Sequence, residues 1–220
     1  MIGALLQTQD SPELKEATTL TESVLKLAKE GKVNEAIPLA KRALAIRERL
    51  LPPNDPLIAT SLSYLAELYI AKRDWGSAKA ALQRLLQMQQ QRVGPEDAGV
   101  ARTLDRLAMA HLGDGNTGKA EEEYKRALQL KEKHFGAESL QVAQTLEGLA
   151  TVYRARNDFD RGAPLYKRAL TIYGRLATVK SAAFDQASKG FTCLIHETNN
   201  RDAGKELDEI WKQFAPAGSP

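Results

Sequence analysis

Apolar residues recur along this chain at helical spacing, and the whole pattern repeats every 42 residues. Four positions separated by three, one and three residues share one face of a helix. A second set, separated by four and three residues, defines the inner face of a following helix. In successive copies the first set is Leu20, Leu62, Leu104 and Leu146; Ser23, Leu65, Leu107 and Leu149; Val24, Ala66, Ala108 and Ala150; Leu27, Tyr69, His111 and Tyr153. The second set is Ala36, Ala78, Ala120 and Gly162; Ala40, Leu82, Tyr124 and Tyr166; Ala43, Leu85, Ala127 and Ala169. Each copy is therefore predicted to be a helical hairpin.

Turn-forming residues separate the two helices of each copy, where a left-handed residue that favours Gly or Asn is expected. These junction positions hold Gly31, Arg73, Gly115 and Asn157. Arg73 departs from that preference, and Asp74 follows it as a cap. Helix breakers and N-capping residues stand between the copies, at 52–56, 94–97 and 136–139. The pattern predicts helices at 12–30, 34–50, 56–72, 76–92, 97–112, 117–134, 139–156 and 160–176, then a degenerate pair at 179–198 and 202–214.

A fixed repeat predicts a stacked all-α array, because each copy contacts mainly its neighbours. We expect a single array over 12–214, between a flexible N-terminal segment at 1–11 and a disordered tail at 215–220. The four clear repeats cover approximately 12–53, 54–95, 96–137 and 138–178. The degenerate C-terminal pair at 179–214 is expected to cap the end of the stack.

The order of Leu, a small residue and Tyr in the first helix, then Ala, Tyr or Leu and Ala in the second, resembles the tetratricopeptide repeat (TPR). The 42-residue period, the repeated Tyr-Lys-Arg-Ala-Leu and the run Val142-Ala143-Gln144-Thr145-Leu146 resemble the longer-helix subtype of kinesin light chain. This resemblance implies a right-handed superhelical α-solenoid of antiparallel helix pairs. That subtype commonly has Asn-Asn between the two leucines of the first helix. Here those places hold Ser63-Tyr64, Asp105-Arg106 and Glu147-Gly148, so its cargo specificity does not carry over.

The resemblance further implies that the first helix of each repeat lines a concave groove. Residues of these helices outside the packed stripe are then candidates to contact a peptide or protein, or else they are ordinary solvated side chains. The planar guanidinium of arginine can donate several hydrogen bonds to a carboxylate or a carbonyl, so a partner with acidic side chains is chemically reasonable. The candidates are Thr60, Ser63, Tyr64, Glu67, Arg102, Asp105, Arg106, Met109, Gln144, Glu147, Thr151, Arg154 and Lys189.

Composition narrows the class of partner and the compartment. The 220 residues carry 31 basic and 28 acidic side chains, interspersed, for a net charge of +3. No basic block suits a nucleic-acid backbone. The apolar run near Met1 is too short for a signal peptide or a membrane span, and the single Cys193 fits a reducing compartment. We therefore expect a cytoplasmic protein without membrane insertion, or a periplasmic or exported one if a native signal was removed.

Catalytic and metal-binding patterns are missing from the sequence. Of the three histidines, His111 occupies a packed repeat position and His134 ends a helix. Cys193 and His196 form the one pair with ligand-like spacing, which is too little for a zinc site or a thiol catalyst. We expect no catalytic residue, cofactor or metal. The leading hypothesis is a non-enzymatic scaffold or adaptor. The alternatives are a regulatory or sensor domain that controls an enzyme or transcription factor, and a self-assembling scaffold.

Overall fold

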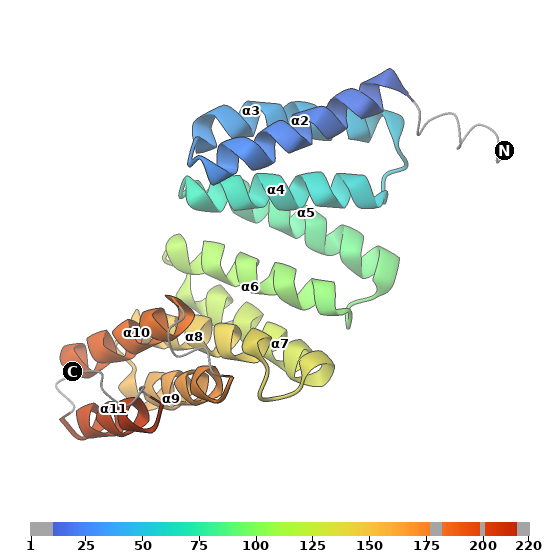
Figure 1. The fold of residues 1–220 in the computed structure, drawn as a ribbon. Coiled ribbons are helices and arrows are strands. Elements are labelled where there is room, and N and C mark those ends of the chain that lie inside the picture. The colour runs from blue at the N-terminus through green and yellow to red at the C-terminus, as the bar shows by residue number, and fades with distance from the viewer. Residues whose placement is uncertain (1–10, 177–181, 199–200, 215–220) are drawn as a thin grey trace. The chain divides into compact units, whose positions relative to one another are not determined.

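The computed structural model describes residues 11–176, 182–198 and 201–214, which form ten helices and no strand (Figure 1). The all-α class is confirmed, and the helix bounds lie within three residues of the predicted ones. The expected flexible ends at 1–11, apart from Ser11, and at 215–220 lie outside the described residues. The helices are α2 (Pro12–Lys29), α3 (Val33–Leu50), α4 (Pro56–Ala71), α5 (Trp75–Val93), α6 (Ala98–Gly113), α7 (Thr117–Phe135), α8 (Leu140–Arg154), α9 (Phe159–Arg175), α10 (Ala182–Thr198) and α11 (Arg201–Phe214).

These helices group into two compact units that divide between Asp114 and Gly115. In the first unit, α2 packs against α3, α3 against α4, α4 against α5, and α5 against α6. The second unit repeats this arrangement from α7 to α11, and α9 also contacts α11. Packing between sequence neighbours is what a hairpin repeat requires. The single array over 12–214 stays a prediction.

The turn inside each hairpin uses a left-handed residue at all four predicted junctions. The φ angles are 73° at Gly31, 59° at Arg73, 77° at Gly115 and 55° at Asn157. Arg73 therefore adopts the repeat conformation although its Cβ makes that conformation costly. Asp74 follows as predicted and caps α5, with its carboxylate accepting a hydrogen bond from the Ser77 backbone N–H at 3.1 Å.

A polar position recurs every 42 residues where the second helix of one repeat packs against the first helix of the next. We call these contacts the polar ladder. They join Arg47 Nη1 to Ser61 Oγ (2.5 Å), Thr103 Oγ1 to Gln89 Oε1 (2.7 Å) and Lys131 Nζ to Thr145 Oγ1 (2.8 Å). Burial lowers the pKa of Arg47, because the charged guanidinium is desolvated. The fourth position is Tyr173, whose register partner is Ala187, and the Tyr173 hydroxyl bonds Glu147 instead.

Close packing in the second unit depends on glycines that lie beneath tyrosine rings. A Cβ on Gly148 of α8 would lie 2.6 Å from the Tyr124 ring. A Cβ on Gly190 of α10 would lie 2.7 Å from the Tyr166 hydroxyl. Both tyrosines come from the preceding second helix and both are buried. In each case a tyrosine ring of one helix occupies the space that a side chain would fill on the next helix.

Candidate functional site

A surface pocket of about 240 Å³ lies in the first unit between α4 and α6. Side chains near the C-terminal end of α5 complete its lining. Four of the predicted groove candidates, Thr60, Ser63, Arg102 and Arg106, are among the lining residues. The full lining is Pro56, Ala59, Thr60 and Ser63 of α4; Leu85, Gln89 and Arg92 of α5; and Gly99, Arg102, Thr103 and Arg106 of α6.

Local caps and the polar ladder fix the backbone around this pocket. Asp55 caps α4 by accepting from the Leu57 N–H at 2.8 Å, and Asp97 caps α6 by accepting from the Gly99 N–H at 2.7 Å. The ladder bond from Thr103 holds the carbonyl end of the Gln89 amide. Two adjacent repeats thus present their first helices at a fixed register, with a polar side chain between them.

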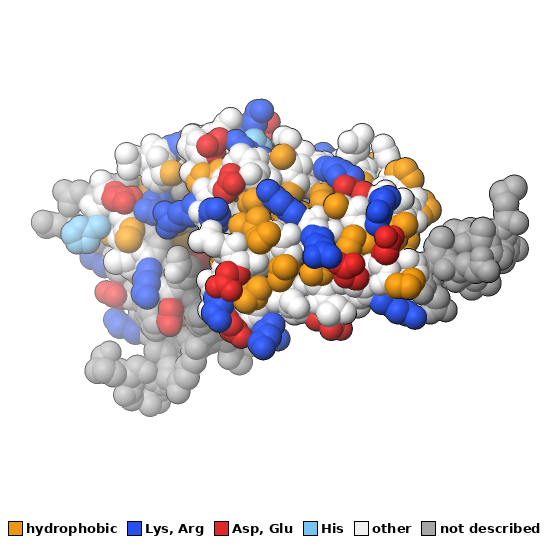
Figure 2. All heavy atoms as spheres, turned by 90° about the horizontal axis from the view of Figure 1, so that it is seen from above, with side chains coloured by type: hydrophobic (Ala, Val, Ile, Leu, Met, Phe, Trp, Pro, Cys, Tyr) orange, Lys and Arg blue, Asp and Glu red, His pale blue; other side chains and the backbone are white. Residues whose placement is uncertain are grey.

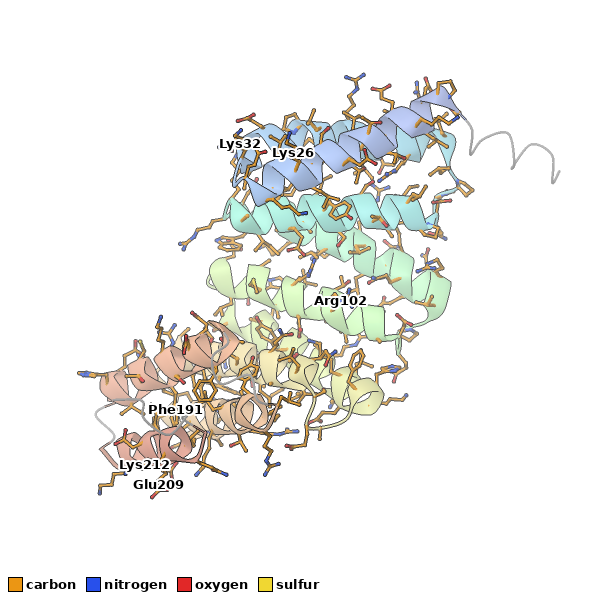
Figure 3. The ribbon with its side chains drawn as sticks, viewed as in Figure 1. Lys26, Lys32, Arg102, Phe191, Glu209 and Lys212 are labelled. Atoms are coloured by element: carbon orange, nitrogen blue, oxygen red, sulfur yellow. The ribbon has the colours of Figure 1, made fainter. Side chains whose placement is uncertain are left out.

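Three arginines make the pocket cationic. Arg106 forms an ion pair with Glu67 of α4, and burial lowers the pKa of Arg106 because its charge is desolvated. Arg102, on α6 in Figure 3, and Arg92 are exposed, and neither pairs with a carboxylate among the described residues. No lining residue is acidic. Two positive charges are therefore open to a ligand.

Four other candidates in the first unit are not among the lining residues. Tyr64 is half-buried and shares a small internal space with Ala40 of α3. Asp105 is half-buried, whereas Met109 is 47% exposed. Glu67 reaches the pocket through its ion pair with Arg106.

In the second unit, several candidates are engaged in internal contacts. Tyr173 donates its hydroxyl proton to Glu147 Oε2 at 3.1 Å, and burial raises the pKa of Glu147. The hydroxyl groups of Thr151 and Tyr166 lie 3.0 Å apart. Arg154 pairs with Glu197 at 3.4 Å. Gln144 and Lys189 are exposed.

Sequence reasoning missed the part of the pocket that comes from the second helix of the repeat, above all Gln89 and Arg92. Gln89 carried a readable signal, since polar residues recur at its register position as Arg47, Gln89 and Lys131. Arg92 carried none, because its register position holds unlike residues in the other copies.

Several of the repeated Lys and Arg residues of the second helices form surface ion pairs. Arg42 pairs with Glu16 and Arg84 with Glu48, while Arg168 pairs with Glu132 at 2.7 Å. Figure 2 shows positive and negative side chains interspersed over the face that it draws. Such surface pairs contribute little to stability individually.

Two further properties concern metal and membrane. In the described ranges, no group of three or more His, Cys, Asp or Glu side chains is placed to hold a metal ion, and Cys193 is an exposed thiol. None of the helices in the described part of the chain is long and apolar enough to cross a membrane.

Consecutive helical hairpins with left-handed junctions define a helical repeat protein. The family model of the tetratricopeptide repeat matches residues 16–91, 59–133 and 99–175. The chain belongs to the tetratricopeptide repeat family, as the resemblance predicted. Members of this family bind protein partners and are generally scaffolds rather than enzymes.

Solved structures with a similar fold extend over nearly the whole chain. Two crystal structures of nearly identical TPR-like repeats, from a Podosopora anserina protein assigned as a kinesin light chain, have TM-scores of 0.76 and 0.74. Both are 18% identical, covering 92% and 93% of this chain and 96% and 95% of those chains. BtubC (BKLC) from P. vanneervenii has a TM-score of 0.62 at 20% identity, with 96% of each chain covered. The MamA protein has a TM-score of 0.58 at 17% identity, covering 94% of this chain and 99% of its own. At these identities the likeness concerns the fold alone. No curated protein sequence matches the chain.

Proposed function

We propose that this chain is a non-enzymatic interaction scaffold that holds an acidic segment of a partner protein in the pocket between α4 and α6. The observation that carries the proposal is the pair of uncompensated arginines, Arg92 and Arg102, in a pocket without a lining carboxylate. Arginine guanidinium groups bind carboxylates through charge-assisted hydrogen bonds, often two at once. The hydroxyl of Ser63 adds a donor on the opposite helix.

The test measures binding of a labelled acidic peptide, with alternating Asp and Glu, to the intact chain by fluorescence anisotropy. We expect Arg102→Glu to weaken binding at least tenfold, because it removes one charge pair and adds a repulsive one. Arg102→Glu/Arg106→Glu should abolish it. Arg126→Glu is the matched control: it makes the same charge change at an exposed position of α7 outside the pocket.

A basic peptide of equal length controls for non-specific attraction. Circular dichroism spectra of all variants should match, because Arg106→Glu also places a carboxylate beside Glu67. Undiminished binding of the acidic peptide to the folded double variant would exclude this pocket as the binding site.

We also propose a cytoplasmic location, supported by the single exposed thiol of Cys193. Fractionation of the native host with the untagged protein tests this location. Recovery in an oxidising compartment would contradict it.

A further inference from the structure

We infer that the pocket between α4 and α6 takes a phosphoryl group carried by the partner protein, an inference that rests on the proposed function. The ligand would therefore be a phosphorylated side chain rather than a lone Asp or Glu. Three properties of the pocket support this choice: its charge, its donors and its volume.

The charge of the pocket matches a dianion. Arg106 is already compensated by Glu67, which leaves Arg92 and Arg102 with two positive charges. A single carboxylate offsets one of them. A phosphorylated side chain carries about −1.5 to −2 charges at pH 7 and three strong acceptor oxygens, so its charge matches that of the two arginines.

The remaining polar groups can donate hydrogen bonds. Because Gln89 Oε1 accepts from Thr103, the Gln89 amide nitrogen is left to donate. A Cβ on the lining residue Gly99 would lie 3.6 Å from that nitrogen, which places the amide at the lining. Ser63 supplies a hydroxyl from α4. Such donors suit a group with many acceptors and no proton to give.

The volume of the pocket admits such a group. The pocket holds about 240 Å³ and is open to the surface. A lone carboxylate would leave much of this space to water, whereas a phosphoryl group with its linking oxygen fills more of it. The same volume leaves space for the side chain that carries the group.

The second unit shows that these residues are not part of the repeat framework. Moving the pocket register forward by 84 residues replaces Ser63 by Glu147, Gln89 by Tyr173, Arg92 by Leu176, Arg102 by Gln186 and Arg106 by Gly190. The equivalent positions therefore hold a carboxylate and no arginine. Tyr173 bonds that carboxylate. An acidic position repels a phosphoryl group, so these equivalent positions of the second unit lack the donor set that the pocket of the first unit has.

The experiment compares four probes on the intact chain by isothermal titration calorimetry: a short Gly-flanked phosphoserine peptide, its Ser and Glu counterparts, and inorganic phosphate. We expect the phosphoserine peptide to bind at least tenfold more tightly than the Glu peptide and than inorganic phosphate. The Ser peptide should not bind. Arg102→Gln and Arg92→Gln should each reduce affinity for the phosphoserine peptide about tenfold, whereas Arg126→Gln should not.

A pH series supplies an independent signature. The second phosphoryl pKa is about 6, so affinity for the phosphoserine peptide should rise several-fold between pH 5 and pH 7.5 as the dianion forms. The ionisable groups at or beside the pocket are its three arginines, Glu67, and Asp97, whose Oδ1 accepts a hydrogen bond from the N–H of the lining residue Gly99 at 2.7 Å. Affinity for the Glu peptide should change less than about twofold, because its carboxyl is largely ionised at pH 5.

The outcomes separate this inference from the proposed function. Equal, Arg102-dependent binding of the Glu and phosphoserine peptides overturns the phosphoryl preference and leaves an acidic-segment site. Inorganic phosphate that binds as tightly as the phosphopeptide overturns the assignment to a phosphorylated partner. If no anionic probe binds, or if binding ignores Arg102, both the inference and the proposed pocket fail.

Discussion

Glu121 of α7 is held by three hydrogen-bond donors and provides a measurable link between pH and stability. Its side chain is 14% exposed and accepts from Lys125 at 2.7 Å, from the Tyr153 hydroxyl at 2.8 Å and from Arg156. The Arg161 guanidinium lies over the Tyr153 ring, 4.6 Å from its centroid. The hydrogen bond from Lys125, followed by those from Tyr153 and Arg156, lowers the pKa of Glu121 to about 2.

Glu121→Gln removes the charge and keeps the size of the side chain. A fall in pKa from 4.5 to about 2 is about 2.5 units, which corresponds to about 3.4 kcal/mol as an upper limit. Lys125 and Arg156 are 55% and 25% exposed, so solvent screening reduces the expected loss to about 2 kcal/mol at pH 7. Because the folded pKa lies below the unfolded one, this stabilisation is complete above about pH 4.5. It is lost as pH falls towards 2.

The assay is hydrogen exchange of the intact chain at several urea concentrations, read separately for α7 to α9 and for α2 to α5. Glu122→Gln, at an exposed position on the same helix, is the matched control. Glu121→Gln should lower protection of α7 to α9 by about 2 kcal/mol at pH 7 and by under about 1 kcal/mol at pH 2.5. The control and the helices of the first unit should change little. A loss that is the same at both pH values, or a Glu121 carboxyl that titrates near 4.5 by carbon NMR, would refute the reasoning.

Further substitutions test the packing of the repeats and the turn at Arg73. Gly148→Ala places a methyl group against the Tyr124 ring. It should lower the free energy of unfolding, measured in urea, by about 1–3 kcal/mol. Gly204→Ala, with open space at its Cβ on a helix, should instead stabilise by up to about 1 kcal/mol, and equal losses would contradict the steric argument. Ser61→Ala should cost about 1–3 kcal/mol, and adding Arg47→Met should recover part of that loss if the buried polar contact is its cause. Arg73→Gly should stabilise the fold by about 0.5–1 kcal/mol and so raise the melting temperature, because φ is 59° there. A lower melting temperature would show that contacts of the arginine side chain outweigh the relief of backbone strain.

The helices were predictable because each structural position occurs in several copies of the repeat. Leu62, Leu104 and Leu146 report one buried position, so an exception such as Arg73 can be placed by its register alone. The register shows that Arg47 and Lys131 occupy a recurring polar position, but it does not show that they are buried, because their hydroxyl partners lie on another helix. A buried long polar side chain interrupts the apolar pattern that defines a buried face.

The pocket was only partly predictable, because the choice between a groove contact and an internal contact depends on neighbouring helices. Arg102 and Glu147 both lie outside the apolar stripe of their helices, yet the first is open and the second is bonded by Tyr173. The residue that would bond such a side chain lies on another helix. The spacing of residues along the sequence does not show how far apart two side chains on different helices lie. Register comparison could have narrowed the choice, since Gln89 and Tyr173 occupy the same repeat position.

The fit of tyrosines over glycines also limits how this gene could grow by recombination. The second helix of one repeat carries a side chain of a particular size. The first helix of the next repeat must leave matching space, as where the Tyr166 ring lies over Gly190. A duplication that placed the second repeat after the fourth would bring Tyr64 to the position of Gly190, where two large rings would compete for one space. The repeats are therefore not interchangeable. A change in their order would also have to change the residues that pack between successive repeats.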